Sequence, residues 1–153
     1  MKPLSLRSDR IVYALHRRQG GSPLGLEAVE VEALSPPPEP YSHAIRAGNT
    51  IYLAGQVAFD REGRIVGDTV EEQARQVWRN IRDILEAAGS SMADVVKVTY
   101  IMQDIREIAE EFPIRREVFE GRPYPAVTAM QAAALGLPGL KMEVDVIAVT
   151  GDG

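Results

Sequence analysis

The sequence predicts an α+β fold in which helices and a β-sheet form two layers. Three observations predict it: a β-prone hairpin near residue 50, two segments with helical spacing of apolar residues, and three later runs typical of strands. The length of 153 residues is usual for one domain. Because "LSPPPEP" (34–40) disfavours helices and sheet pairing, we expect an N-terminal extension at 1–28 and the main domain at 29–153.

The extension is rich in Lys and Arg, and it contains "GGSPLG", which is typical of loose or peripheral packing. Its "RIVYAL" segment is a candidate edge strand. After the prolines, "YSHAIRAGNTIYLAGQVAFD" (41–60) contains two short β-prone runs. They flank Gly48 and Asn49, two residues that can adopt the positive φ of a tight turn, and this pattern predicts a hairpin.

A helix is predicted over residues 69–88, followed by a strand at 94–102. Thr69 and Glu72 have the spacing of a capping box, and Gly89 is placed to end the helix. The helix has one apolar stripe, formed by Val70, Ala74, Val77, Ile81, Leu85 and Ala88. The β-branched residues of "DVVKVTYIM" favour a strand that this stripe covers, so helix and strand form a crossover unit.

The helical pattern returns over residues 104–121, where Pro113 is expected to kink or interrupt the helix. Two strands follow, "AVTAMQAAA" (126–134) and "LKMEVDVIAV" (140–149). In the second strand, apolar and acidic residues alternate, so Glu143 and Asp145 share one face.

Composition disfavours several classes of function. A net charge of −5 argues against nucleic acid as the main partner. The chain has no cysteine and only two histidines, which lie far apart, so we expect no metal and no cofactor. No run approaches the roughly 18 apolar residues of a membrane span, so we expect no membrane partner and a soluble, cytoplasmic protein.

Three motifs, in the same order and at the same spacing, resemble those of the YjgF/RidA family of reactive-intermediate deaminases. They are "PYSHAIRAGNTIYLAGQ", "EEQARQVWRNIRDILEAAGSSMADVVKVTYIMQD" and "YPAV…KMEVDVIAV", and the resemblance spans residues 29–149. It implies a chorismate-mutase-like fold, a mixed sheet covered by two helices. It also implies a homotrimer with clefts for small metabolites between subunits, and hydrolysis of imines or enamines formed from amino acids.

The resemblance also points to a missing arginine. In deaminating members of the family the matching strand reads Pro-Ala-Arg, and the arginine binds the substrate carboxylate; here the position is Val127. A charge-assisted pair of this kind contributes roughly 1.5–3 kcal/mol, and valine has no donor. Ala129 and Gln131 share the face of Val127, so we expect an apolar cleft wall. Arg122 is the nearby basic residue in the sequence that can stand in for the arginine.

The resemblance assigns roles to the remaining cleft positions. Glu143 matches a carboxylate that holds or activates a water, and burial is expected to raise its pKa. Tyr41, Gly55 and Gln56 match substrate-binding positions, whereas Ala54 replaces a frequent serine. Each residue also has a structural interpretation: Glu143 as part of a solvated face, Tyr41 as a packing residue and Gly55 as a requirement of the backbone.

These observations leave three hypotheses. The first is a deaminase-type hydrolase with an altered substrate range, and the second is a trimeric metabolite-binding protein without catalysis. The third, an RNA-cleaving role, ranks last because it needs a positive surface and an acid–base pair.

Overall fold

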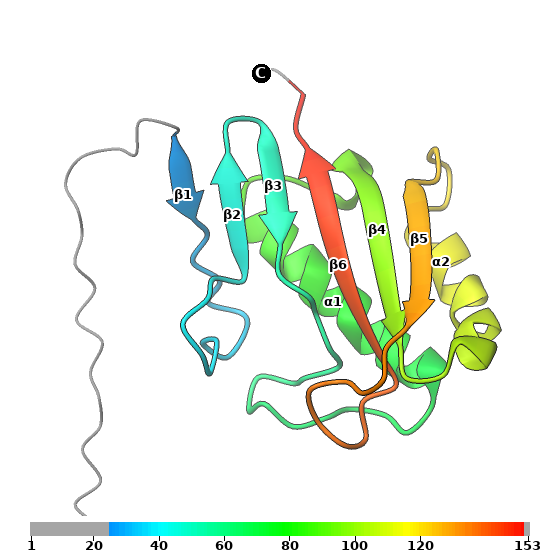
Figure 1. The fold of residues 1–153 in the computed structure, drawn as a ribbon. Coiled ribbons are helices and arrows are strands. Elements are labelled where there is room, and N and C mark those ends of the chain that lie inside the picture. Colours follow the sequence, from blue (N-terminus) through cyan, green and yellow to red (C-terminus); the bar gives the residue numbers. More distant parts are fainter. Residues whose placement is uncertain (1–24, 152–153) are drawn as a thin grey trace, which may run out of the picture.

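The computed structural model describes residues 25–151, in which a six-stranded sheet is covered on one face by helices (Figure 1). The strands are β1 (Leu26–Ala28), β2 (Ala44–Ala47), β3 (Thr50–Leu53), β4 (Val95–Met102), β5 (Ala126–Gln131) and β6 (Met142–Val149). The α-helices are α1 (Val70–Ala87) and α2 (Phe112–Val118), and 3₁₀ turns η1 (Met92–Asp94) and η2 (Ile105–Glu111) precede β4 and α2. The predicted α+β fold with two helices on a mixed sheet is confirmed.

The strand order is β1-β2-β3-β6-β4-β5, so the last strand of the chain lies in the middle of the sheet. All neighbouring pairs are antiparallel except β4 and β5, which run parallel. Helix α1 connects β3 to β4, and β6 inserts between these two strands. Strand β6 therefore places its side chains at the centre of the sheet.

The ends of α1 follow the predicted capping pattern. Thr69 Oγ1 accepts a hydrogen bond from Glu72 N at 3.2 Å, and Glu72 Oε2 accepts one from Thr69 N at 3.2 Å. At the other end, Gly89 adopts a φ of 68°. In the hairpin Gly48 has a φ of 62°, whereas Asn49 does not adopt a positive φ.

The segment predicted as one kinked helix over 104–121 forms two pieces. The Asp104 side chain caps η2 by accepting from Arg106 N at 2.9 Å, and α2 begins directly afterwards at Phe112. Pro113 lies in the first turn of α2, where its missing N–H needs no partner. The proline thus separates the two pieces, as expected, and fixes where α2 starts.

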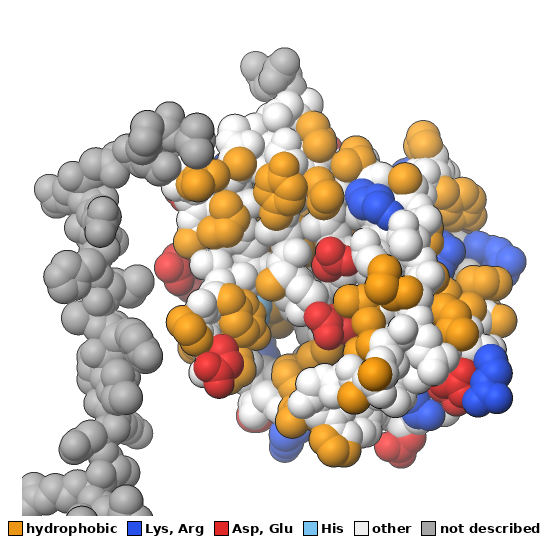
Figure 2. Space-filling view, viewed as in Figure 1, with side chains coloured by type: hydrophobic (Ala, Val, Ile, Leu, Met, Phe, Trp, Pro, Cys, Tyr) orange, Lys and Arg blue, Asp and Glu red, His pale blue; other side chains and the backbone are white. Residues whose placement is uncertain are grey.

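The two faces of the sheet differ in their surroundings. Side chains of β4 and β6 that face the helices are buried, among them Val98, Tyr100, Val144 and Val146. The opposite face, called the open face here, is not covered by a helix (Figure 1). Hydrophobic side chains gather on this face, and acidic side chains lie near its centre (Figure 2). Exposed apolar residues on it include Leu26, Tyr52 and Met130.

Residues 1–24 of the predicted extension, including the candidate edge strand "RIVYAL", lie outside the described residues. The end of the extension forms β1, which pairs with β2 at the edge of the sheet. Within residues 25–151, no helix combines the length and the apolar character that a membrane crossing requires.

Candidate functional site

A cavity of about 660 Å³ lies on the open face beside the carboxylate of Glu143 in β6. Tyr41 comes from the loop before β2, Gly55 follows β3, and Leu137 belongs to the loop between β5 and β6. The cavity lining contains two carboxylates, Glu143 of β6 and Glu39 of the loop before β2. Three of the predicted site residues, Tyr41, Gly55 and Glu143, therefore meet in one cavity.

Glu143 packs directly against the backbone of Gly55. A Cβ atom added to Gly55 would lie 2.7 Å from Glu143 Cδ, 2.9 Å from Cγ and closer still to Oε1. The φ of Gly55 is not positive, so backbone conformation does not require glycine here. Gly55 is needed because any larger residue would occupy the position of the carboxylate.

The residue after Gly55, Gln56, connects the Gly55 backbone to strand β6. Its backbone exchanges two hydrogen bonds with Val144, at 2.8 and 2.9 Å, which tie the segment after β3 to β6. The Gln56 side chain is buried, and its Nε2 donates to Ala54 O at 3.0 Å. The Gln56 side chain does not line the 660 Å³ cavity but lines a smaller hollow of about 50 Å³, which also includes Tyr41 and Gly55; its contact with substrate stays a prediction.

Burial raises the pKa of the Glu143 carboxyl above its usual range, and the charge of Asp145 raises it further. Among residues 25–151, no Lys or Arg forms an ion pair with Glu143. The direction of the pKa shift and burial as its main cause both match the prediction. Glu143 is buried by its own chain, and Val127 and Ala129 take no part.

Val127, Ala129 and Gln131 lie on the helix-covered face of the sheet. Val127 is opposite Val98 of β4, and Val98 is in turn opposite Val146 of β6. Partners across a ladder point to the same face, and Val98 and Val146 are buried under the helices. Glu143 is three positions from Val146 and therefore points to the opposite, open face. One chain by itself does not bring Val127 and Glu143 together.

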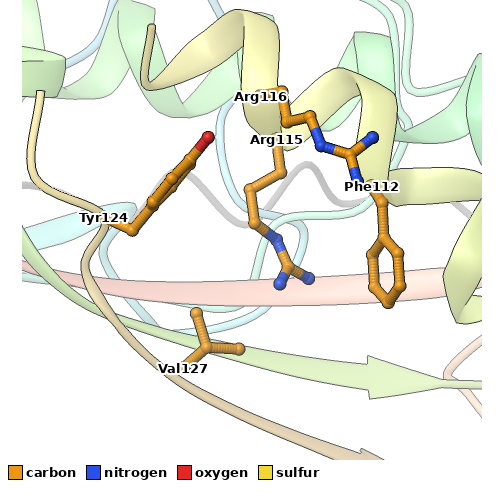
Figure 3. Close-up of a pocket in the computed structure, with 5 residues that line it drawn as sticks. All are labelled: Phe112, Arg115, Arg116, Tyr124 and Val127. Atoms are coloured by element: carbon orange, nitrogen blue, oxygen red, sulfur yellow. The ribbon is translucent and has the colours of Figure 1, made fainter. Parts of the chain in front are cut away.

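Val127 forms part of a second pocket, of about 310 Å³, between α2 and β5 (Figure 3). The remaining lining comes from α2 and from the segment before β5, and comprises Phe112, Arg115, Arg116 and Tyr124. The Gln131 side chain lies at the far end of β5, where its Oε1 accepts from Ile105 N at 3.1 Å. Val127 gives this pocket an apolar wall that two guanidinium groups border, and Ala129 and Gln131 are not part of its lining.

A buried carboxylate fixes one of these guanidinium groups. Glu111 is fully buried and accepts hydrogen bonds from Tyr100 Oη at 2.6 Å and Trp78 Nε1 at 3.3 Å. Arg115 Nη2 lies 2.7 Å from Glu111 Oε2. Burial raises the pKa of Glu111, and its three partners favour the ionised form. The buried Glu111 carboxylate therefore holds the Arg115 guanidinium over Val127 (Figure 3).

Arg115 and Arg116 were not among the site residues predicted from the sequence. The predicted substitute, Arg122, is exposed and does not line the 310 Å³ pocket. A helix that starts at Phe112 would have been the informative feature, because Phe112, Arg115 and Arg116 then have i, i+3, i+4 spacing and share one face. The expectation of one longer helix obscured this spacing.

Comparisons with known proteins agree with the fold and the motifs. The profile of the family described as endoribonuclease L-PSP matches residues 30–150. A RutC family protein of Pyrococcus horikoshii is 40% identical over 123 residues, which are 80% of this chain and 96% of the relative. The human 2-iminobutanoate/2-iminopropanoate deaminase is 36% identical over 113 residues, 73% of this chain and 81% of the human protein.

Solved structures give the same result. The crystal structure of Escherichia coli TdcF with bound serine matches with a TM-score of 0.76 and 27% identity, over 82% of this chain and 99% of TdcF. A structure described as a putative endoribonuclease L-PSP from Entamoeba histolytica matches with a TM-score of 0.76 and 37% identity, over 82% of this chain and 99% of that chain. The chain therefore belongs to the endoribonuclease L-PSP family, which is the YjgF/RidA family.

Proposed function

We propose that this protein is a hydrolytic deaminase of imines or enamines that acts in a cleft between two copies of the chain. The observation that carries the proposal is the placement of Glu143: a half-buried carboxylate with a raised pKa, held against Gly55 at the wall of a 660 Å³ cavity. The name of the human relative, an imine deaminase, supports the reaction class.

Glu143 has the properties of a general base for this reaction. Its ionised carboxylate takes a proton from a water molecule while the water oxygen attacks the carbon of an iminium ion, and the C=N π electrons move to nitrogen. The resulting carbinolamine receives the proton back from Glu143 on its nitrogen. The C–N bond then breaks, the hydroxyl proton leaves with the nitrogen, and the products are a carbonyl compound and ammonium. A raised pKa makes the protonated carboxyl a better match for this second transfer near neutral pH.

The cleft needs two copies because the two groups of predicted site residues point to opposite faces. The cavity at Glu143 opens on the open face, and the 310 Å³ pocket at Val127 lies on the helix side at the edge strand β5. The apolar side chains of the open face favour burial against a partner, since patches of this kind mark interaction sites. We propose a homotrimer, in which each cavity meets the β5 edge of a neighbour.

The test uses imines generated in situ from several amino acids, including apolar and amide ones, with ammonia release as the readout. The parent should accelerate hydrolysis over buffer. Glu143→Gln should reduce turnover about 10²- to 10⁴-fold, because it removes the base and keeps the shape. Asp145→Asn is the matched control on the same face: turnover should persist, and its pH profile should shift toward acid because one charge that raises the pKa of Glu143 is gone.

The second candidate is a metabolite-binding protein without catalysis, which the replacement of the strand arginine by Val127 favours. No ammonia release from any imine, together with binding of a 2-keto acid, would support this alternative. The net charge of −5 gives no support to the ribonuclease activity in the family description.

A further inference from the structure

The pocket between α2 and β5 combines apolar walls with two cationic groups. Its apolar residues, Phe112, Tyr124 and Val127, are all exposed, and Val127 itself is 39% exposed. Isolated exposed hydrophobic residues are ordinary, but three around one hollow of about 310 Å³ are typical of a ligand site. The guanidinium group of Arg115 points away from α2 toward Val127, whereas the Arg116 side chain extends along α2 toward Phe112 and lines the same pocket from there (Figure 3).

Arg115 already has its charge balanced. Its Nη2 pairs with the buried carboxylate of Glu111, and its Nε donates to Tyr100 Oη at 3.1 Å. The guanidinium also stacks on the Tyr100 ring, 4.4 Å from the ring centroid, and its side chain is only 18% exposed. Arg115 is therefore a rigid part of the pocket lining, and the Nε–Nη2 edge of its guanidinium is already engaged by Glu111 and Tyr100.

Arg116 differs from its neighbour in each of these respects. It is exposed, and among residues 25–151 no carboxylate pairs with it and no hydrogen bond engages its side chain. By contrast, Arg75 of α1 is held between Glu71 and Glu117. Arg116 therefore brings an uncommitted positive charge to the rim of an apolar pocket.

We propose that Arg116 of α2 binds the carboxylate of the ligand, in place of an arginine at position 127, and that Phe112, Tyr124 and Val127 receive an apolar side chain. The ligand class is then an imino or 2-keto acid with a branched aliphatic or aromatic side chain. The inference rests on the proposed cleft and specifies its substrate class. Valine at position 127 is consistent with this proposal, because an arginine there would fill the space that the apolar side chain of the ligand occupies.

Binding measured by calorimetry tests the anchor without requiring turnover. The probe is 2-oxo-4-methylpentanoate, a stable branched 2-keto acid, and 2-oxobutyrate is the short comparison. Each buried methylene strengthens binding about fourfold, so the branched acid should bind about 15-fold tighter to the parent. Arg116→Ala should weaken binding of both acids about 10- to 100-fold, and Arg116→Lys should recover part of the loss because it keeps the charge but not the fork.

Arg82→Ala is the matched control. Arg82 is an exposed arginine on α1 that lines a different groove, so its removal changes net charge equally and should leave binding unchanged. A second control is 4-methyl-2-pentanone, which keeps the branched chain and lacks the carboxylate; parent and Arg116→Ala should bind this ketone equally.

Two results would overturn the proposal: equal affinity of parent and Arg116→Ala for the branched keto acid, or absence of binding by the parent. The outcome is separable from that of the catalytic proposal. If keto-acid binding depends on Arg116 but no imine releases ammonia, the carboxylate anchor is supported and the deaminase proposal is refuted. If imines are hydrolysed and Arg116→Ala does not change the rate, the deaminase proposal is supported and the carboxylate anchor is refuted.

Discussion

Replacing Gly55 by alanine should displace the carboxylate of Glu143, the proposed base, without harming the fold. The new Cβ would lie 2.7 Å from Glu143 Cδ, whereas ordinary contact begins at 3.4 Å. The carboxyl carbon must therefore move by about 0.7 Å, and Oε1, which is nearer, by more than about 1 Å. A misplacement of about 1 Å at a reacting group can cost on the order of 10²-fold in rate, and this is the loss we expect in imine hydrolysis by Gly55→Ala.

Stability should change little, because the clashing atoms belong to the end of a flexible side chain. Since the φ of Gly55 is not positive, alanine can even stabilise the chain by about 0.4–1 kcal/mol through the unfolded state. The assay combines ammonia release with thermal unfolding. Gly136→Ala is the matched control: Gly136 lines the same cavity, and a Cβ there meets no atom within 4 Å. A folded Gly55→Ala with the parent's turnover would refute the role of Glu143 as the positioned base.

Three further predictions concern stability and ligand choice. Thr69→Ala should lower the free energy of unfolding by about 1 kcal/mol, measured by urea denaturation, because it removes the capping hydrogen bond to Glu72 N; a neutral result would contradict the cap. Glu143→Gln should be more stable than the parent at neutral pH. A raised folded pKa means that the parent loses stability as pH rises from its unfolded pKa to its folded pKa, so the advantage should vanish in acid; a gap that persists there would argue against the shift. Val127→Arg should tighten binding of 2-oxobutyrate about tenfold in calorimetry and make it less dependent on Arg116, with a loss of stability of roughly 1–3 kcal/mol from overpacking; no gain in a folded trimer would point to another ligand class.

Local sequence patterns were sufficient for the elements whose ends are fixed by short-range chemistry. The capping box of Thr69 and Glu72 and the left-handed Gly89 defined α1, because both depend on residues within one turn. The alternation along β6 correctly separated Glu143 from the buried face.

The arrangement of the candidate site could not be derived in the same way. That Val127 and Glu143 point to opposite faces follows from the pairing of β4 with both β5 and β6, and single-strand periodicity does not specify pairing. Gly55 gave no sign that it makes room for Glu143, since the two are far apart in the sequence. The position of Arg116 depended on where α2 starts, which Pro113 determines.

The central claim is that each site is completed by a second copy of the chain. Mixed assembly of two inactive variants tests it most directly: Glu143→Gln disables the cavity on the open face, and Val127→Glu places a repelling carboxylate at the β5 edge. Each variant alone should hydrolyse imines poorly. In trimers assembled at random from equal amounts, about a quarter of the clefts should combine an intact Glu143 with an intact β5 edge, so about a quarter of the parent's activity should return. An activity equal to the mean of the two variants would contradict the account, because it would show that one chain holds the whole site.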